Sequence, residues 1–266
     1  MQLLVGILLA VLIALLAWRA HALSTSGAYA AVLTGGLIFG MGGLPWAVLL
    51  LVFFISSSAL SRLFAQRKAA LSEKFSKGSR RDWAQVLANG GLGALLAVVY
   101  ALSGEPVWLW AAYIGTMAAV NADTLATELG VLNPTLPRLV TTLKPVDRGT
   151  SGAVSRLGTL AALGGAVLVG LAAVLVSSQV SFGVGLLAAA LGGLAGSFFD
   201  SLLGATVQAI YYCPECQKET ERHPQHSCGE QTRHLRGWRW LDNDGVNFLC
   251  SLAGAVVTLG VWSLLV

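Results

Sequence analysis

The sequence predicts an all-α fold, a polytopic bundle of transmembrane helices, and three observations support this fold class. Hydrophobic residues make up 55% of the 266 residues and charged residues only 11%, whereas a soluble domain carries about 25% charged residues. The mean hydropathy is +0.70. The apolar residues are gathered into runs close to the roughly 20 residues that a membrane-spanning helix needs. Together these features exclude an ordinary soluble domain.

We expect about eight spans in a single membrane domain over residues 1–266, from runs of this length. The weakest assignment is the pair on either side of GMGGLP, which could form one broken hairpin. The first run has no basic residues before it, so we interpret it as a span and not as a cleaved signal peptide. In chain order the expected spans cover about 3–18, 28–44, 46–61, 84–102, 107–128, 153–176, 183–209 and 245–265.

The positive charges predict how these spans cross the membrane. All 17 lysine and arginine residues fall into four of the connections. With eight spans these connections share one side, which the positive-inside rule assigns to the cytoplasm. Both termini then lie outside, and a multi-pass protein of a bacterial cytoplasmic membrane is our hypothesis. The net charge of +4 is therefore a topology signal, and we expect no nucleic-acid partner.

The first basic connection, residues 61–82, can lie in part against anionic lipid headgroups. At its end Arg81, Gln85 and Asn89 follow one another at four-residue steps, which places them on one side of a helix that we expect to begin at Arg81. Because buried amides are costly without partners, we expect this side to face a polar cavity or another helix.

The stretch NADTLATELG, residues 121–130, puts carboxylates at the end of an apolar segment. Asn121, Asp123, Thr124 and Glu128 lie on the polar arc of one helix, and acidic residues in a span are candidates for a functional site. The alternative is a structural ion pair or a helix end that dips into water. On a straight helix Asp123 and Glu128 are about 140° apart. We therefore expect either a break near residues 121–124 or separate tasks for the two carboxylates.

The next connection, residues 130–152, ends in Lys144, Arg148 and the run GTSGAVS at 149–155. Backbone N–H groups at a helix N-terminus, with Thr150 or Ser151 as the cap and two cations beside them, attract anions. We expect a phosphate-binding loop here, although an ordinary flexible loop and cap is the alternative. Its candidate residues are Gly149, Thr150, Ser151, Gly152 and Ser155.

The last two spans also carry polar faces. Asp200, Ser201 and Gln208 share one face of the seventh span, together with Ser197 and Gly204. The eighth span opens with LDNDGVN, in which Asp244 and Asn247 share a face and follow Asn243. These helix ends should bring one polar set to a single leaflet, unless it reflects unrelated polar packing. The set is Asn89, Asp123, Glu128, Asp200, Asp244 and Asn247.

Residues 210–243 form an insertion that contains CPECQKETERHPQHSCG. Its Cys213, Cys216, His226 and Cys228 have the spacing of a zinc knuckle on the cytoplasmic side, with a structural tetrahedral Zn²⁺. His226 is preferred to His223 because it lies beside Cys228. A disulfide is the alternative, and a reducing cytoplasm disfavours it. The insertion by itself says nothing about activity.

Asp123, Glu128, Asp200 and Asp244 are oxygen ligands of the kind that suits Mg²⁺, which substrate phosphates then complete. Cations and a helix N-terminus suit the phosphates themselves. Phosphoryl or nucleotidyl transfer needs little beyond positioning and charge neutralisation. Because the site lies at a membrane face, we expect an amphiphilic acceptor.

Five motifs then carry a resemblance: RDWAQVLANGG, NADTLATELG, KPVDRGTSGAVS, GSFFDSLLGATVQ and LDNDGVN. In order and spacing, from about Lys74 to Asn247, they resemble the integral-membrane family labelled domain of unknown function ninety-two, whose characterised plant members are phytyl-phosphate kinases. The family is similar in character to dolichol kinases and lipid cytidylyltransferases. Two departures are Leu125, where an aromatic residue is expected, and Ala153, where a glycine is expected.

The resemblance implies phosphoryl transfer from a nucleoside triphosphate, CTP, to an isoprenyl monophosphate. In the resulting hypothesis of a prenyl-phosphate kinase, Asp123 and Asp200 hold Mg²⁺, Lys144 and Arg148 hold the triphosphate, and Arg81 meets the acceptor phosphate. The further residues expected to contact the substrates are Gln85, Asn89, Asn121, Thr124, Glu128, Gly149, Thr150, Ser151, Gly152, Ser155, Ser201, Gln208, Asn243 and Asn247.

Three other functions stay open at this point: a CTP-dependent lipid cytidylyltransferase, a small-solute or ion transporter, and a zinc-loop scaffold without catalysis. A transporter should carry polar groups deep on both sides of the midplane, whereas here the carboxylates cluster toward one face. The expected partners are a nucleoside triphosphate, an isoprenyl phosphate and the lipid bilayer, and homo-oligomerisation is compatible with this interpretation.

Overall fold

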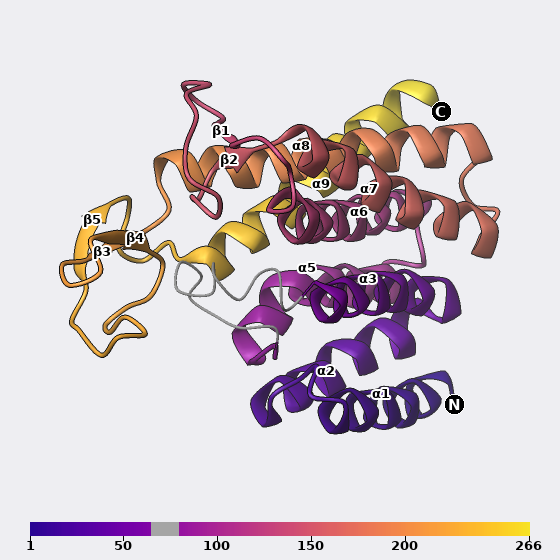
Figure 1. Ribbon diagram of the computed structural model, residues 1–266. Coiled ribbons are helices and arrows are strands. Elements are labelled where there is room, and N and C mark those ends of the chain that lie inside the picture. Colours follow the sequence, from indigo (N-terminus) through magenta and orange to yellow (C-terminus); the bar gives the residue numbers. More distant parts are fainter. Residues whose placement is uncertain (65–79) are drawn as a thin grey trace.

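The computed structural model describes residues 1–64 and 80–266, and this part of the chain contains eight α-helices (Figure 1). Each coincides with one of the eight apolar segments. Most of the basic connection at 61–82 lies outside the described residues. The helices are α1 (Gln2–Arg19), α2 (Thr25–Leu37), α3 (Leu44–Leu63), α5 (Trp83–Leu102), α6 (Val107–Gly130), α7 (Arg156–Val176), α8 (Phe182–Thr206) and α9 (Asn243–Leu265).

Six of these helices, α1, α3, α5, α7, α8 and α9, are long and apolar enough to cross a membrane. Helix α2 has only 13 residues, continues as a π-helical turn, η1 (Ile38–Gly42), and stops at Gly43, where φ is +80°. Helix α6 has 24 residues, but its polar second half keeps it out of this group. The prediction of eight helical segments is thus confirmed, whereas six of them qualify as spans by length and composition.

Helix α6 is the centre of the bundle. Every residue from Leu109 to Ala122 is buried, and α3, α5, α7, α8 and α9 all pack against it. Close approach depends on small residues, because a Cβ atom added at Gly254 of α9 would collide with the Cβ of Ala119. A helix that is covered on all sides must find partners for its polar side chains within the protein.

The bundle has two unlike ends. Both termini lie at one end, and the small β-structures lie at the other, on the left of Figure 1. Helices α1 and α2 form one edge, α3 and α5 follow, and α7, α8 and α9 lie on the far side. Arg19 at the end of α1 and the basic connections at 131–155 and 207–242 fall at the end opposite the termini, so within the described residues the predicted segregation of charge appears in three dimensions.

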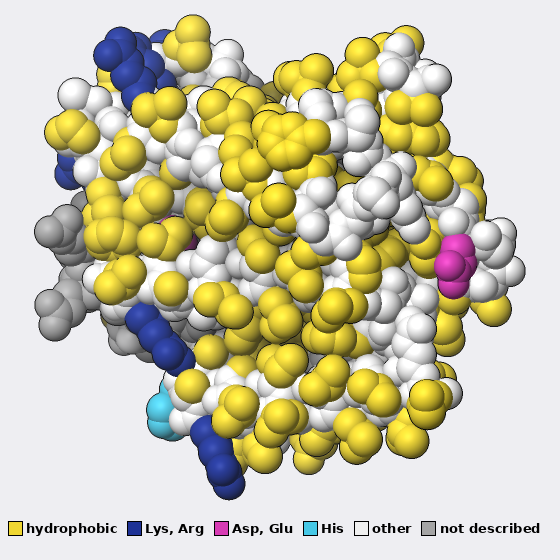
Figure 2. Space-filling view, turned by 90° about the vertical axis from the view of Figure 1, so that its right-hand side faces the viewer, with side chains coloured by type: hydrophobic (Ala, Val, Ile, Leu, Met, Phe, Trp, Pro, Cys, Tyr) yellow, Lys and Arg dark blue, Asp and Glu magenta, His cyan; other side chains and the backbone are white. Residues whose placement is uncertain are grey.

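The end with the termini is apolar outside and inside. Figure 2 shows it covered mostly by hydrophobic side chains, with charged side chains at its margins. Inside, Trp46 stacks on Tyr113 with ring centroids 4.2 Å apart, and Tyr100 and Trp110 pack against Trp46. All four residues are buried. Large side chains therefore fill the bundle on this side.

Two small sheets interrupt the connections at the opposite end. Strand β1 (Arg138–Leu139) pairs antiparallel with β2 (Ala153–Val154) and folds the 131–155 connection back on itself. In the insertion, β3 (Ile210–Cys213) lies between β4 (Lys218–Thr220) and β5 (Arg233–Arg236), antiparallel to both. The structure thus adds short β-elements to a fold that is otherwise helical.

Candidate active site and metal cluster

A polar cavity of about 510 Å³ lies between helix ends at the side of the bundle away from the termini. Its walls come from α3, α5, α6, α7, α8 and α9, from the loop before α7, and from the insertion. Most of the residues that the sequence singled out meet here. They are Arg81, Gln85, Asn89, Asp123, Thr124, Glu128, Arg148, Gly149, Thr150, Ser151, Gly152, Ser155, Asp200, Ser201, Asn243 and Asn247.

Asp123 of α6 and Asp200 of α8 form the acidic centre of the cavity. The Ser197 hydroxyl donates a hydrogen bond to Oδ1 of Asp123 at 3.5 Å. The negative charges of Asp123 and Glu221 both act on Asp200. Oδ2 of Asp200 is buried and has no hydrogen-bond partner among the described residues. Buried carboxylates that repel one another need a cation to stay ionised, and an oxygen-rich set of this kind fits Mg²⁺.

Glu128 has different surroundings from Asp123. Helix α6 runs unbroken from Val107 to Gly130, so the alternative of a break near residues 121–124 is wrong and the division of labour remains. Oε1 of Glu128 accepts a hydrogen bond of 2.7 Å from the hydroxyl of Ser61 in α3. Glu128 also attracts Arg81. Its carboxylate is therefore engaged by the protein on the α3 side of the cavity.

Arg81 precedes α5 and does not begin it. Asp82 is the N-cap, and a reciprocal capping box joins it to Gln85, so the helix begins at Trp83. The Arg81 guanidinium donates to the hydroxyls of Ser57 at 3.0 Å and Ser58 at 2.8 Å. Burial lowers the pKa of Arg81 from its ordinary value, and the charge of Glu128 opposes that shift. Arg81, which was expected to meet the acceptor phosphate, therefore lies in the cavity wall and is hydrogen-bonded to α3.

The loop before α7 differs from its prediction in one respect. The N-cap of α7 is Ser155, whose Oγ accepts a hydrogen bond of 3.1 Å from the N–H of Gly158. Thr150 and Ser151 are not caps, because β2 separates them from the helix. Gly152 has a φ of +81°, and a Cβ there would collide with the backbone of Ala205 in α8. The loop is thus pressed against the end of α8.

Arg148 enters the cavity from the same loop. Its Nη2 donates to the carbonyl oxygens of Asn133 and Pro134, both at 2.9 Å. Its Nε is buried and has no hydrogen-bond partner among the described residues. Arg148 therefore retains a donor for an anion beside the loop and the first turn of α7.

Four candidates lie outside the cavity wall. Lys144 is exposed and is not among the lining residues. Asn121 is fully buried and ties helices together, since its Nδ2 donates to the carbonyl of Gly165 in α7 and its Oδ1 accepts from Ser56 in α3, both at 2.9 Å. Asp244 is in the first turn of α9, next to the lining residue Asn243, and is not itself among the lining residues. Gln208 is buried behind Ser151 and accepts a hydrogen bond from its hydroxyl at 2.8 Å.

Other lining residues were missed in the sequence. Ser61 ends the third span and Thr159 lies in the first turn of α7, and nothing in the local pattern distinguishes either from an ordinary helix residue. Ser197 was placed by periodicity on the polar face that includes Asp200, but it was not among the residues expected to contact the substrates or the metal ion. Glu221 comes from the insertion, which the sequence did not link to the site.

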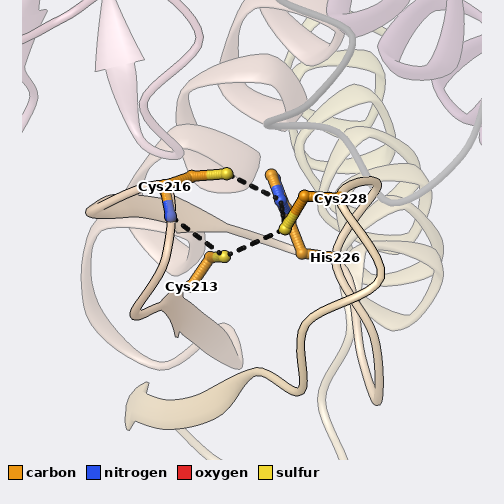
Figure 3. A group of neighbouring side chains, drawn as sticks. All are labelled: Cys213, Cys216, His226 and Cys228. Atoms are coloured by element: carbon orange, nitrogen blue, oxygen red, sulfur yellow. Dashed lines mark hydrogen bonds between the residues drawn. The ribbon is translucent and has the colours of Figure 1, made fainter.

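The insertion holds a compact cluster of Cys213, Cys216, His226 and Cys228, whose candidate ligand atoms all lie within 4.8 Å of one another (Figure 3). The Sγ atoms of Cys213 and Cys228 are 3.6 Å apart, and Nδ1 of His226 is 3.5 Å from Sγ of Cys216 and 3.3 Å from Sγ of Cys228. Ligand bonds of about 2.3 Å for sulfur and about 2.0 Å for nitrogen give tetrahedron edges close to these distances. The geometry therefore fits a tetrahedral metal ion.

The cysteines are free thiols, so the disulfide alternative is not supported. His223 stacks on Tyr211 with ring centroids 4.4 Å apart, which leaves His226 as the histidine of the cluster. The backbone N–H of Glu230, followed by His226, lowers the pKa of the Cys228 thiol to about 7, whereas the hydrogen bond with Cys228, followed by burial, raises the pKa of the Cys216 thiol to about 12. Of these two thiols, Cys228 is the one whose thiolate, the form that a metal needs, is favoured. Cys250, the cysteine outside this cluster, is buried in α9.

A small apolar crevice of about 70 Å³ adjoins the cavity. Side chains of α1, α2, α3 and α5 line it, Phe53 and Phe54 among them. It shares Arg81, Gln85 and Asn89 with the polar cavity. A polar site and an apolar crevice therefore meet at one cation and two amides.

Comparisons with known proteins agree with the motifs. The family described as Integral membrane protein DUF92 matches residues 8–255. Protein PGR of Arabidopsis thaliana is 35% identical, over 97% of this chain and 95% of its own length. An uncharacterised membrane protein of Methanocaldococcus jannaschii is 35% identical over 77% of this chain and 82% of its own. Protein VTE6, chloroplastic, of Arabidopsis thaliana is 25% identical over 89% of this chain and 64% of its own.

No solved structure matches the chain. The family match covers nearly the whole sequence and includes all five motifs. The resemblance inferred from those motifs is thereby confirmed, and the chain belongs to the DUF92 family of integral membrane proteins.

Proposed function

We propose that the protein transfers a phosphoryl group from a nucleoside triphosphate to an isoprenyl, phytyl-like monophosphate. The observation that carries the proposal is the pair of buried carboxylates, Asp123 and Asp200, in one cavity with the 148–155 loop. Such a pair requires a cation, and a cationic loop beside it suits a polyphosphate. The family resemblance implies CTP as the nucleotide and an isoprenyl monophosphate as the acceptor.

Asp123 and Asp200 would hold Mg²⁺, with Ser197, Ser201 and Asn247 nearby in the wall. An ion bound there supplies charge neutralisation for the carboxylates and the triphosphate. The Cys/His cluster would hold Zn²⁺, whose four protein ligands leave no open position for substrate and give it a structural role.

The remaining steps belong to the chain itself. Arg148, the backbone of 149–152 and the first turn of α7 bind the triphosphate. Arg81, Gln85 and Asn89 bind the acceptor phosphate, which is ionised at pH 7 because its second pKa is about 6. One of its oxygens attacks the γ-phosphorus, the bond from that phosphorus to the bridging oxygen breaks, and the nucleoside diphosphate leaves. No general base is needed.

We place the hydrocarbon chain of the acceptor in the apolar crevice. The crevice and the cavity share Arg81, Gln85 and Asn89, so a phosphate bound by these groups would have its first isoprene unit between α2, α3 and α5. We also propose eight membrane crossings with the cavity on the cytoplasmic side, because the described basic connections lie at this end.

Purified protein in lipid nanodiscs, given phytyl monophosphate, Mg²⁺ and CTP labelled at the γ-phosphate, should form labelled phytyl diphosphate. Asp200→Asn should lower the rate at least about 100-fold, because a lost metal ligand removes several kcal/mol of charge stabilisation. Glu105→Gln, at an exposed carboxylate away from the cavity, serves as the matched control.

Two results would refute the proposal: no diphosphate from any nucleotide and prenyl monophosphate, or full activity in Asp200→Asn. Label transferred from the α-phosphate, with release of pyrophosphate, would instead identify a lipid cytidylyltransferase.

A further inference from the structure

The Cys/His insertion contributes a carboxylate to the cavity. Glu221 follows β4 directly and lines the cavity wall, and its charge acts on Asp200. Every other lining residue comes from the helical bundle or from the connections next to α5 and before α7. The insertion is therefore part of the site and not an appendage to it.

A chain of hydrogen bonds leads from Glu221 to the phosphate loop. Oε1 of Glu221 accepts a bond of 3.0 Å from Nε2 of Gln208. Oε1 of the same Gln208 accepts a bond of 2.8 Å from the hydroxyl of Ser151. Gln208 is only 1% exposed, so its amide is held between these two partners. A displacement of Glu221 would therefore reach Ser151.

The same contact is reinforced by close packing around the end of α8. Nη1 of Arg236, in β5, donates to the carbonyl of Gly204 at 2.9 Å, and the N–H of Trp238 donates to the carbonyl of Val207 at 2.8 Å. On the other side of α8, a Cβ added at Gly204 would lie 2.8 Å from the N of Gly152 and from Oγ of Ser151. The insertion and the phosphate loop therefore both pack against the C-terminal end of α8.

The Cys/His cluster fixes the segment that carries Glu221 at both ends. Glu221 lies between Cys216 and His226 in the sequence, and both belong to the cluster. The register of β3 and β4 places Cys213 opposite Lys218 and Tyr211 opposite Thr220. A metal ion bound by the cluster would close this segment into a loop and hold its carboxylate at the cavity.

We propose that Glu221 is a positioning residue through which the metal-bound Cys/His cluster orders the phosphate loop, by way of Gln208 and Ser151. Loss of the metal releases Glu221, loosens residues 149–152, and weakens nucleotide binding while the helical bundle stays folded. This inference rests on the proposed phosphoryl transfer for its kinetic part only.

Two variants of Glu221 separate its hydrogen bond from its charge. Glu221→Ala removes the acceptor for Gln208 and should raise the KM for CTP about tenfold with kcat within about twofold, as expected for one lost charged hydrogen bond. Glu221→Gln keeps an acceptor oxygen and should restore most of the affinity. Glu219→Ala removes an exposed carboxylate from the same insertion and should behave like the wild type.

Hydrogen–deuterium exchange tests the coupling without turnover. Treating the protein with a Zn²⁺ chelator, and checking zinc content by elemental analysis, should speed exchange of the amides in 149–153, and Glu221→Ala should do the same with zinc in place. The amides of α6 should stay protected in both cases.

The outcomes distinguish the two proposals. Coupled exchange in a protein that forms no diphosphate would refute the kinase and keep the positioning role. An active kinase whose 149–153 exchange ignores both changes would refute the positioning role. So would protein purified without zinc, or Glu221→Gln as impaired as Glu221→Ala, because the latter result would make the charge of Glu221, and not its hydrogen bond, the important property.

Discussion

Asp123 and Glu128 lie on one uninterrupted helix but face different neighbours. The hydroxyl of Ser197 in α8 donates a hydrogen bond to Asp123, and the negative charge of Asp123 repels that of Asp200. Glu128 accepts a hydrogen bond from Ser61 of α3 and attracts Arg81. The first carboxylate is therefore available to a metal ion, whereas the second holds α3 and the Arg81 segment against α6.

The two residues should respond differently to loss of charge. Asp123→Asn should lower kcat at least about 100-fold, since it removes a ligand from the proposed metal site. Glu128→Gln retains an oxygen that can accept from Ser61, and should change kcat less than about tenfold while lowering thermal stability, because Arg81 loses its countercharge. Rates under saturating Mg²⁺ and thermal unfolding in detergent measure both effects. Equal loss of kcat in the two variants would contradict the division of labour.

Helix α5 shows why an element's position matters more than its polarity. The stripe of Arg81, Gln85 and Asn89, which begins just before α5 and continues into it, was expected to face a polar cavity or another helix, and it borders both the polar cavity and the apolar crevice. Nδ2 of Asn89 donates one hydrogen bond to the backbone carbonyl of Gln85, at 2.8 Å. An amphiphile bound at this border would have its phosphate head in the polar cavity and its hydrocarbon chain in the apolar crevice.

Narrowing the crevice should selectively affect acceptors that carry an isoprene unit. Gly90 lines it, and an added Cβ there would make an ordinary contact with Thr34 at 3.8 Å, so we expect Gly90→Val to reduce the free volume of the crevice. Displacing about two methylene groups, at about 0.8 kcal/mol each, should lower the ratio of kcat/KM for phytyl monophosphate over that for methyl phosphate, which has no isoprene unit, about tenfold. Gly164→Val, where a Cβ meets nothing within 4 Å, is the control. An unchanged ratio would show that the hydrocarbon chain of the acceptor does not occupy this crevice.

The bundle contains a polar cavity at one end and is filled by large aromatic side chains at the other. The cavity lies on the side of the β-elements, while Trp46, Tyr100, Trp110 and Tyr113 fill the half that begins at the termini. Solute transport would need polar groups on both sides of the midplane. Within the described residues, this distribution favours a site that works from one face, as the enzyme hypothesis requires.

Topology can be tested with single cysteines at the two ends. Ser103 and Thr141 are both exposed, the first in the connection after α5 and the second in the loop before α7. A membrane-impermeant maleimide should label Ser103→Cys in intact cells and Thr141→Cys only after permeabilisation, with the unsubstituted protein as background. Labelling of both from outside would contradict the proposed crossings of α6 and the cytoplasmic cavity.

The sequence by itself determined the membrane class, the eight helical segments and the four residues of the Cys/His cluster. Hydropathy runs and ligand spacing are local properties, so they survive without knowledge of the fold. The boundaries were less secure. The N-cap of α7 is Ser155 and not the predicted Thr150 or Ser151. The reason is that β2, which pairs with β1 from earlier in the connection, occupies the residues between Ser151 and the helix.

Only the tertiary structure decided which polar residues share the cavity. Lys144, Asn121 and Asp244 had the right chemistry but lie outside the wall, whereas Glu221 had no recognisable motif and lies in it. A helical wheel gives the direction of a side chain relative to its own helix, but not which neighbour covers that face. That choice depends on packing between distant segments, such as the insertion and α8, and no local pattern specifies it.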